Sequence, residues 1–284
     1  MWSHGGVGAF EATELDAAEA AALTTVAEQV AAEAAGLVLR ARESMLAGRA
    51  VSVDTKTSAT DVVTAVDRES EQLIRTRLAE LRPGEPVLGE EEGGRAGDGV
   101  TWVVDPIDGT VNFLYGLPEF AVSVAAQVGG VSVAGAVVEP VSGRRWTGTR
   151  GAGSWLDGRP LRVSEPERLD LALLGTGFAY VPERRARQAE LVAGLLGHVR
   201  DIRRPGSAAL DLCAVAAGWT DAYFEHGLHR WDWAAGALIA AEAGAVVSLP
   251  GEDPELGVDG TLAAAPSIAD ALRTAVVKCG AGGV

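Results

Sequence analysis

Cysteine, aromatic residues and basic residues are all scarce in this chain. Its 284 residues include two cysteines and 5% aromatic residues, and 24 Lys and Arg stand against 39 Asp and Glu, for a formal net charge of −15. Cys213 and Cys279 lie far apart and form no C-x-x-C motif. A disulfide framework is therefore not expected, and a reducing cytoplasm is the default compartment. The acidic balance argues against nucleic acids and anionic membranes as partners.

An uninterrupted apolar run is missing near the N-terminus. The first ten residues contain no basic region, and Asp16 and Glu19 interrupt the apolar stretch that follows. We expect neither a signal peptide nor a membrane span. Hydrophobic residues nevertheless make up 48% of the chain. A large core built mainly from Ala, Val and Leu is therefore expected.

The spacing of apolar residues predicts helices and strands along most of the chain. Helices are predicted over residues 14–48, 65–81, 183–196, 208–217, 233–242 and 268–277, and strands over 51–53, 86–88, 102–104, 121–127, 131–139, 144–149, 153–156, 171–176, 201–204, 223–225, 245–247 and 261–264. Gly129-Gly130 is typical of a hairpin, residues 158–160 of a turn, and residues 280–284 of a frayed tail. We predict one α+β domain over residues 1–284, with an antiparallel-rich part (about 14–165) and an alternating α/β part (about 166–279).

The most informative segment runs from Trp102 to Thr110. Trp102-Val-Val reads as a buried strand, and Asp105 and Asp108 follow it at a spacing of three residues. Pro106 lacks a backbone donor, so we expect the chain to leave the sheet between the two acids. Both carboxylates and the Ile107 carbonyl then offer hard oxygen ligands suited to magnesium. A helix beginning at Gly109-Thr110 would present free N–H groups to a phosphate.

An isolated D-x-x-D-G motif is more typical of an Asx turn that caps a helix. Here further acidic groups follow other short apolar segments. Gly89-Glu90-Glu91 follows one predicted strand, Asp232 lies at the mouth of a predicted helix, and Asp61 and Asp67 bracket an apolar run. Clustered carboxylates are unfavourable unless cations neutralise them, so a site with several metal ions would also explain how so acidic a protein holds an anionic substrate.

Together these segments resemble the signature segments of the inositol monophosphatase family. The segments are residues 61–67, 89–91, 102–113 and 231–236, and the likeness extends from about residue 23 to about residue 265. The resemblance implies a layered α/β/α/β/α sandwich of the sugar phosphatase type. It also implies two or three Mg²⁺ ions held by Glu90, Asp105, the Ile107 carbonyl, Asp108 and Asp232, with water attacking the phosphorus directly.

The family likeness also assigns roles in catalysis and substrate binding. Thr110, paired with Asp67, would orient and deprotonate the attacking water, and Glu90 would assist through its metal. Phosphate and polyol would contact Asp108, Gly109, Thr110, Gly206, Ser207, Ala208, Glu225 and Asp232. The simpler interpretations are a first-turn acid for Asp67, a helix N-cap for Asp232 and a surface acid for Glu225.

Two residues have open assignments. Lys56 is expected either to favour the phosphate or to hold the Asp61 loop, although a lone lysine is more often solvated. Glu91 is either a group that supports the ligands from behind or a solvated surface acid. His226 and His229 are three residues apart, but magnesium does not favour imidazole, so we do not predict a histidine metal site.

The implied activity is Mg²⁺-dependent hydrolysis of inositol 1-phosphate, a small phosphorylated polyol. Related phosphatases that act on histidinol phosphate, fructose 1,6-bisphosphate or 3′-phosphoadenosine phosphate share the metal motifs and remain alternatives. A non-catalytic scaffold or regulator is a more remote alternative. The family likeness further implies a homodimer and inhibition by lithium.

Overall fold

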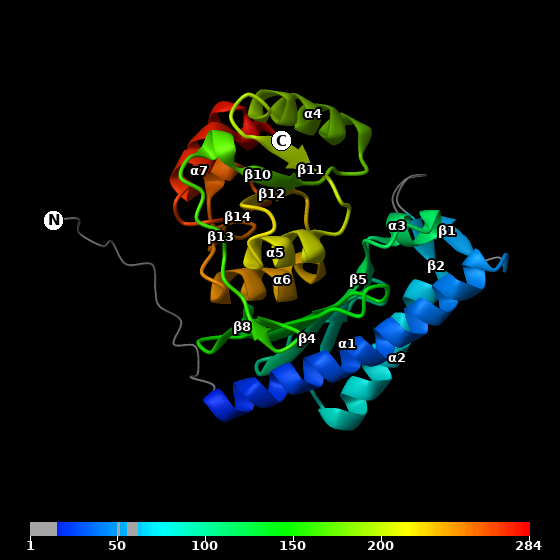
Figure 1. Cartoon of the computed structure of the whole chain (residues 1–284). Helices are drawn as coiled ribbons and strands as arrows, with labels where there is room; N and C mark the ends of the chain where they lie inside the picture. The colour runs from blue at the N-terminus through cyan, green and yellow to red at the C-terminus, as the bar shows by residue number, and fades with distance from the viewer. Residues whose placement is uncertain (1–15, 50–51, 56–61) are drawn as a thin grey trace.

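The chain folds into five alternating layers of helices and sheets (Figure 1). The computed structural model describes residues 16–49, 52–55 and 62–284. The predictions for Lys56 and Asp61 lie outside these residues. A seven-stranded sheet and a five-stranded sheet provide the two β layers, and pairs of helices lie outside and between them. The α/β/α/β/α sandwich predicted from the family likeness is confirmed.

The first layer consists of α1 (Ala17–Leu46) and α2 (Ala65–Leu81). The buried stripe of α1 is composed largely of alanine and valine, which lets the helix lie close against β5 and β6. Helix α2 begins with a capping box in which the Thr64 and Asp67 side chains each bond to the other's backbone N–H. The short β1 (Val53–Thr55) and β2 (Val62–Thr64) pair just before it.

The seven-stranded sheet has the order β3-β4-β5-β6-β7-β8-β9. Its strands are β3 (Val87–Gly89), β4 (Val100–Asp108), β5 (Ala121–Val128), β6 (Val131–Val138), β7 (Arg145–Thr149), β8 (Gly153–Leu156) and β9 (Arg159–Pro160). The β3–β4 pair is parallel and the remaining pairs are antiparallel. Trp102 and Val104 face the α1–α2 core whereas Val103 faces the central helices. Burial on both faces explains why β4 reads as one continuous apolar run.

The central layer consists of α5 (Ala208–Ala216) and α6 (Arg230–Glu242). Both helices contact both the first and the second sheet. The second sheet has the order β11-β10-β12-β14-β13. Its strands are β10 (Leu173–Thr176), β11 (Asp201–Arg203), β12 (Ala222–His226), β13 (Val246–Ser248) and β14 (Gly260–Ala264). The central helices thus carry side chains into the space between the sheets.

The fifth layer consists of α4 (Pro182–Leu195) and α7 (Ala269–Lys278), which cover the outer face of the second sheet. Short 3₁₀ turns lie at Leu169–Leu171, Pro254–Leu256 and Ala281–Gly283. The last of these corrects the prediction of a frayed tail. Ala281 is fully buried in the core beneath α7, so apolar contact holds the C-terminus in place.

Strand β4 also differs from its prediction. It does not leave the sheet at Pro106 but continues to Asp108, which pairs with Ala121 across a register shift that begins after Asp105. Strand β3 pairs with β4 only as far as Val104. Because no strand among the described residues borders β4 on that side beyond Val104, the missing N–H of Pro106 leaves no ladder bond unmade.

Helix α1 is the one helix in the described part of the chain that is long and apolar enough to cross a membrane by length and composition. Leu23, Val30 and Val38 along it are fully buried against the first sheet and α2. A core helix of this kind passes the same test. The absence of a membrane span stays a prediction.

Candidate active site

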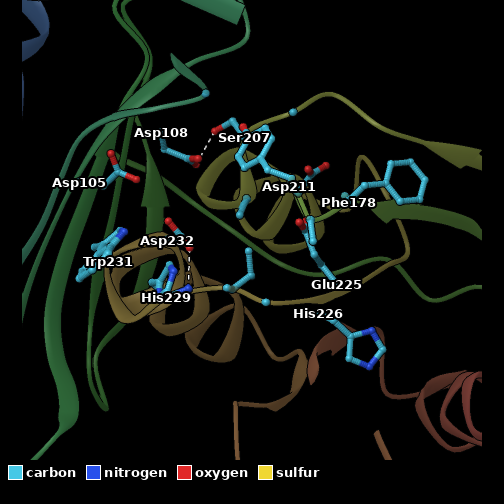
Figure 2. Close-up of a pocket in the computed structure, with 18 of the residues that line it drawn as sticks. Asp105, Asp108, Phe178, Ser207, Asp211, Glu225, His226, His229, Trp231 and Asp232 are labelled. Carbon is cyan, nitrogen blue, oxygen red and sulfur yellow. Dashed lines mark hydrogen bonds between the residues drawn. The ribbon is translucent and has the colours of Figure 1, made fainter. Parts of the chain in front are cut away.

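The site is an acid-lined cavity of about 720 Å³ between the two sheets. Figure 2 shows Asp105, Asp108 and Asp232 converging from β4 and α6, with Glu225 and Asp211 farther along the cavity. Of the residues predicted from sequence, the cavity lining includes Glu90, Asp105, Ile107, Asp108, Gly109, Thr110, Gly206, Ser207, Ala208, Glu225 and Asp232. The fold therefore brings together residues that are as much as 142 positions apart, since Glu90 and Asp232 line the same cavity.

Asp105 lies at the centre of the acidic group. Its side chain is almost fully buried, and its Oδ1 accepts a hydrogen bond from the Ile107 N–H at 3.0 Å. Burial, followed by the negative charges of Glu90, Asp108 and Asp232, holds the pKa of Asp105 well above its ordinary value. Without a cation, a negative charge on this carboxyl is therefore unfavourable.

Asp108 joins the first sheet to the start of α5. Its Oδ2 accepts hydrogen bonds from Ser207 Oγ at 2.6 Å and from the Ala209 N–H at 2.7 Å. Burial raises the pKa of Asp108 to about 6, although the bonds from Ser207 and Ala209 lower it. The N-terminal N–H of Ala209 on α5 is thus bonded to Asp108. This N–H group is therefore not free to bind a ligand.

Asp232 enters from α6 and is not the N-cap of that helix. The helix begins at Arg230, with His229 as its N-cap, and Asp232 Oδ2 accepts a hydrogen bond from the His229 N–H at 2.6 Å (Figure 2). Burial and the charges of Asp108 and Glu90 hold its pKa well above the ordinary value. Its second oxygen is left to face the cavity, so the bond to His229 does not prevent Asp232 from binding a metal ion.

Glu90 follows the end of β3, and its backbone N–H donates to the Val104 carbonyl at 3.3 Å. This bond extends the parallel pairing by one residue and places Glu90 beside Asp105. Glu91 does not line the cavity. Its N–H donates instead to Glu71 on α2 at 2.7 Å.

Thr110 and Asp67 meet behind the acidic group. Thr110 Oγ1 lies 3.0 Å from Asp67 Oδ1 and 3.0 Å from the Ile107 carbonyl oxygen. The single hydroxyl proton can therefore be donated to either acceptor. Burial raises the pKa of Asp67, against the lowering effect of bonds from Thr64 and Thr110. Asp67 serves both as a helix cap and as a partner of Thr110.

Glu225 lines the far wall of the cavity, and the buried Tyr223 supports it from behind. Tyr223 donates its hydroxyl proton to Glu225 Oε2 at 2.5 Å. Burial raises the pKa of Glu225 to about 7. A carboxyl group poised in this way can both donate to and accept from the hydroxyls of a polyol.

Asp211 and Asn112 were not predicted from the sequence. Asp211 is buried on α5 beside Glu225, and its Oδ1 has no hydrogen-bond partner. A charge within the apolar run of residues 208–216 could have identified it. Asn112 donates to the carbonyls of Glu119 at 2.5 Å and Pro205 at 2.8 Å, and so ties α3 (Thr110–Tyr115) to the loop before α5.

His226 bonds to the Leu256 carbonyl, and its ring points away from the acids in Figure 2.

The carboxylates fit a hard cation by type and by charge. Four acids and a carbonyl oxygen line one end of the cavity. Burial, together with the neighbouring negative charges, raises the pKa values of Asp105, Asp108 and Asp232, and a bound cation would offset this cost of holding negative charge. In the described residues, no three acidic, histidine or cysteine side chains already stand close enough to hold one ion.

Comparison with known proteins places this fold and site in context. Residues 19–281 match the inositol monophosphatase family. An inositol-1-monophosphatase of Mycobacterium leprae is 55% identical over 90% of this chain and 94% of its own length. A protein of Pseudomonas aeruginosa named Nus factor SuhB is 42% identical over 80% of this chain and 84% of its own. The solved structure of Mycobacterium tuberculosis SuhB superposes with a TM-score of 0.79 at 48% identity, covering 92% of this chain and 98% of that one.

The layered fold and the acid-lined cavity, together with these similarities, define a metal-dependent hydrolase of phosphoric monoesters. Within that class, the chain belongs to the inositol monophosphatase family.

Proposed function

We propose that this protein hydrolyses inositol 1-phosphate with Mg²⁺ as its metal, releasing inositol and phosphate. The observation that carries the proposal is the convergence of Glu90, Asp105, Asp108 and Asp232 beside the Thr110–Asp67 pair in one cavity. The relative from Mycobacterium leprae is named for this activity. The acidic end of the cavity would bind the metal ions and the phosphate, and the end that contains Glu225 would bind the polyol.

Each group has a defined task in the proposed reaction. Bound Mg²⁺, in two or three copies, would neutralise the phosphate charge, acidify the attacking water and stabilise the leaving oxygen. Thr110 orients that water through its hydroxyl and passes a proton to Asp67, which lies within hydrogen-bond distance. Gly109, Gly206, Ser207 and Ala208 line the cavity, where they would border the phosphate and the inositol ring. Glu225 holds the polyol hydroxyls at the opposite end.

The test is phosphate release from inositol 1-phosphate, histidinol phosphate, fructose 1,6-bisphosphate and 3′-phosphoadenosine phosphate, with Mg²⁺ and after EDTA. We expect EDTA to abolish turnover and inositol 1-phosphate to be the fastest substrate. A preference for another ester would mean that the protein uses the same metal chemistry on the substrate of a related phosphatase. Millimolar lithium should inhibit at limiting Mg²⁺, and an unchanged rate would contradict that part of the proposal.

We further propose a homodimer. Exposed apolar side chains gather where the end of α1 meets the segment after α3 (Thr110–Tyr115). Leu46, Tyr115 and Leu117 are 59%, 81% and 48% exposed, and Leu46 lies against Gly116. A second copy of the chain would cover them. Light scattering that gave the mass of one 29.2 kDa chain at micromolar concentration would contradict the dimer.

The remaining expectations concern location and partners. The net charge of −15 disfavours nucleic acids and anionic membranes. The two free cysteines suit a cytoplasmic protein. Cell fractionation tests the compartment, and sedimentation with anionic vesicles tests the membrane.

A scaffold or regulatory function is the second candidate, because relatives include proteins named Nus factor SuhB. As the sole function it would not require the ligand positions to stay acidic, yet all four carboxylates are present. Failure of the metal-loaded protein to hydrolyse any of these phosphate esters would favour this candidate.

A further inference from the structure

Glu90 is the one acid of the metal-facing group that lies on a tight turn between two extended segments. Gly89 precedes it in β3, and the Gly89 N–H donates to the Gly93 carbonyl at 3.0 Å, which closes the turn. The position of the Glu90 carboxylate therefore depends on what holds residues 89–93. A loop with one such bond alone would not fix a side chain to the accuracy that a metal ligand needs.

Glu71 on α2 holds this turn from behind. Its Oε2 accepts a hydrogen bond from the Glu91 N–H at 2.7 Å, and its Oε1 accepts one from the Glu92 N–H at 3.0 Å. The Glu71 side chain is fully buried. Both carboxylate oxygens are thus engaged by the backbone of the two residues that follow Glu90.

Arg75, one helical turn later, completes the arrangement. Its Nε donates to Glu71 Oε1 at 2.9 Å, and its terminal nitrogens donate to the Val87 carbonyl at 3.3 Å and the Gly93 carbonyl at 2.6 Å. The Glu71–Arg75 pair therefore bonds to the backbone on both sides of Glu90.

Gly89 is the residue that permits this approach. A Cβ at Gly89 would lie 2.3 to 2.6 Å from the Glu71 carboxylate atoms, closer than any real contact. The glycine before Glu90 is thus required by the buried acid on another element. The dihedral angles of Gly89 do not require glycine, because its φ is not positive.

The same face of α2 reaches two other parts of the site. Asp67, one turn before Glu71, contacts Thr110, and Ser70 Oγ donates to the Pro106 carbonyl at 3.1 Å. One rigid helix therefore contacts the Glu90 turn, the Asp105–Asp108 segment of β4 and Thr110 at the start of α3. Relative positions of groups from three chain segments are set by spacing along a single helix.

We propose that Glu71, with Arg75, is a positioning residue that sets the Glu90 carboxylate for metal binding. The proposal rests on the metal site under "Proposed function". A buried ion pair is in general a weak source of stability, so its value here lies in orientation. Loss of groups that orient metal ligands from behind typically weakens metal affinity by about 10- to 100-fold.

The test compares Mg²⁺ binding by the full-length protein and by two disrupting variants, Glu71→Gln and Arg75→Gln. A glutamine at position 71 has one acceptor oxygen, and its amide group would face an N–H donor. Binding is measured by calorimetric titration with Mg²⁺ and by the rise of Tm with Mg²⁺ concentration, and Tm in EDTA reports folding. Glu33→Gln is the matched control. Glu33 on α1 pairs with Arg77 on α2, at a place on α2 that does not contact the Glu90 turn.

We expect Glu71→Gln and Arg75→Gln to weaken Mg²⁺ binding by about 10- to 100-fold, while KM for the phosphate ester at saturating Mg²⁺ stays near wild type. Glu33→Gln should leave binding unchanged. If both variants lowered Tm in EDTA but bound Mg²⁺ as tightly as wild type, Glu71 would be merely structural and the proposal would be overturned. If wild type itself bound no Mg²⁺, the proposed metal site would fail instead.

Gly89→Ala provides an independent test of the proposal if Glu71→Gln fails to fold. The added methyl displaces the Glu71 carboxylate without removing its charge, so we expect the same loss of Mg²⁺ affinity. Gly99→Ala is its control, because a Cβ there meets nothing within 4 Å. Equal Mg²⁺ affinity of these two alanine variants would contradict the proposal.

Discussion

The hydroxyl of Thr110 lies 3.0 Å from the Asp67 carboxylate, which is 43 residues earlier in the chain. The two residues come from α3 and α2, and the same Asp67 caps α2 through Thr64. The proton acceptor is therefore held rigidly by its own helix. This arrangement makes the roles of both side chains separately testable.

Thr110→Val removes the hydroxyl while keeping the shape of the side chain. We expect kcat to fall by about 10²- to 10⁴-fold, because the attacking water loses its path for the proton. Thr110→Ser retains the hydroxyl and should keep most of the activity. The measurement is kcat at saturating Mg²⁺, and a valine variant as active as the serine variant would refute the role of Thr110.

Asp105→Asn should have opposite effects with and without metal. In EDTA the variant should be at least as stable as wild type, because the substitution removes a buried negative charge that the neighbouring acids repel. With Mg²⁺ it should show little of the wild-type rise in Tm and no phosphate release. Thermal melts in EDTA and in Mg²⁺ measure the Tm of the variant and of wild type under each condition and so test both expectations. Asp201→Asn, at an exposed acid paired with Arg203, is the control.

The raised pKa of Glu225 predicts how stability depends on pH in EDTA. Its pKa is about 7 in the folded protein and 4.5 for an unperturbed glutamate. Between these values the folded state retains a proton that the unfolded state has lost, so the contribution of this group falls as pH rises and is lost above about 7. The total is at most about 3 kcal/mol, and less because the side chain is only partly buried.

Denaturant unfolding of wild type and Glu225→Gln measures this effect, since both variants share the other acids of the site. The difference in free energy of unfolding, wild type minus variant, should decline as the pH rises from about 4.5 to 7. A difference that stayed constant over that range would show that the Glu225 pKa is not raised.

Gly177 lies against Glu225 in the same way that Gly89 lies against Glu71. A Cβ at Gly177 would lie 2.0 to 2.4 Å from the Glu225 carboxylate atoms. We expect Gly177→Ala to displace Glu225 and raise KM for a polyol phosphate, while Mg²⁺ affinity stays unchanged. Steady-state kinetics at a series of Mg²⁺ concentrations measures KM for the phosphate ester and the Mg²⁺ affinity separately. A lowered Mg²⁺ affinity with unchanged KM would contradict the assignment of Glu225 to the polyol.

Local patterns were sufficient for most elements of the fold. The bounds predicted for α2, residues 65–81, and for β8, residues 153–156, agree with the structure. Both are bordered by turn or capping residues, whose preferences are local. The start of α6 was predicted three residues late, because a histidine N-cap is atypical. The C-terminal residues around Ala281 were predicted to fray because their burial depends on distant elements.

The sequence by itself was enough to predict Glu90, Asp105, Asp108 and Asp232 as candidate ligands but not the buried Asp211, because each of the four lies next to a short apolar strand or at a helix start, where carboxylates suit the binding of a hard cation. Only the tertiary structure decided how they are held. The bonds from Ser207 and Ala209 to Asp108, and from Glu91 and Glu92 to Glu71, join segments far apart in the chain. Such contacts form only when the layers pack against each other, so no local pattern encodes them.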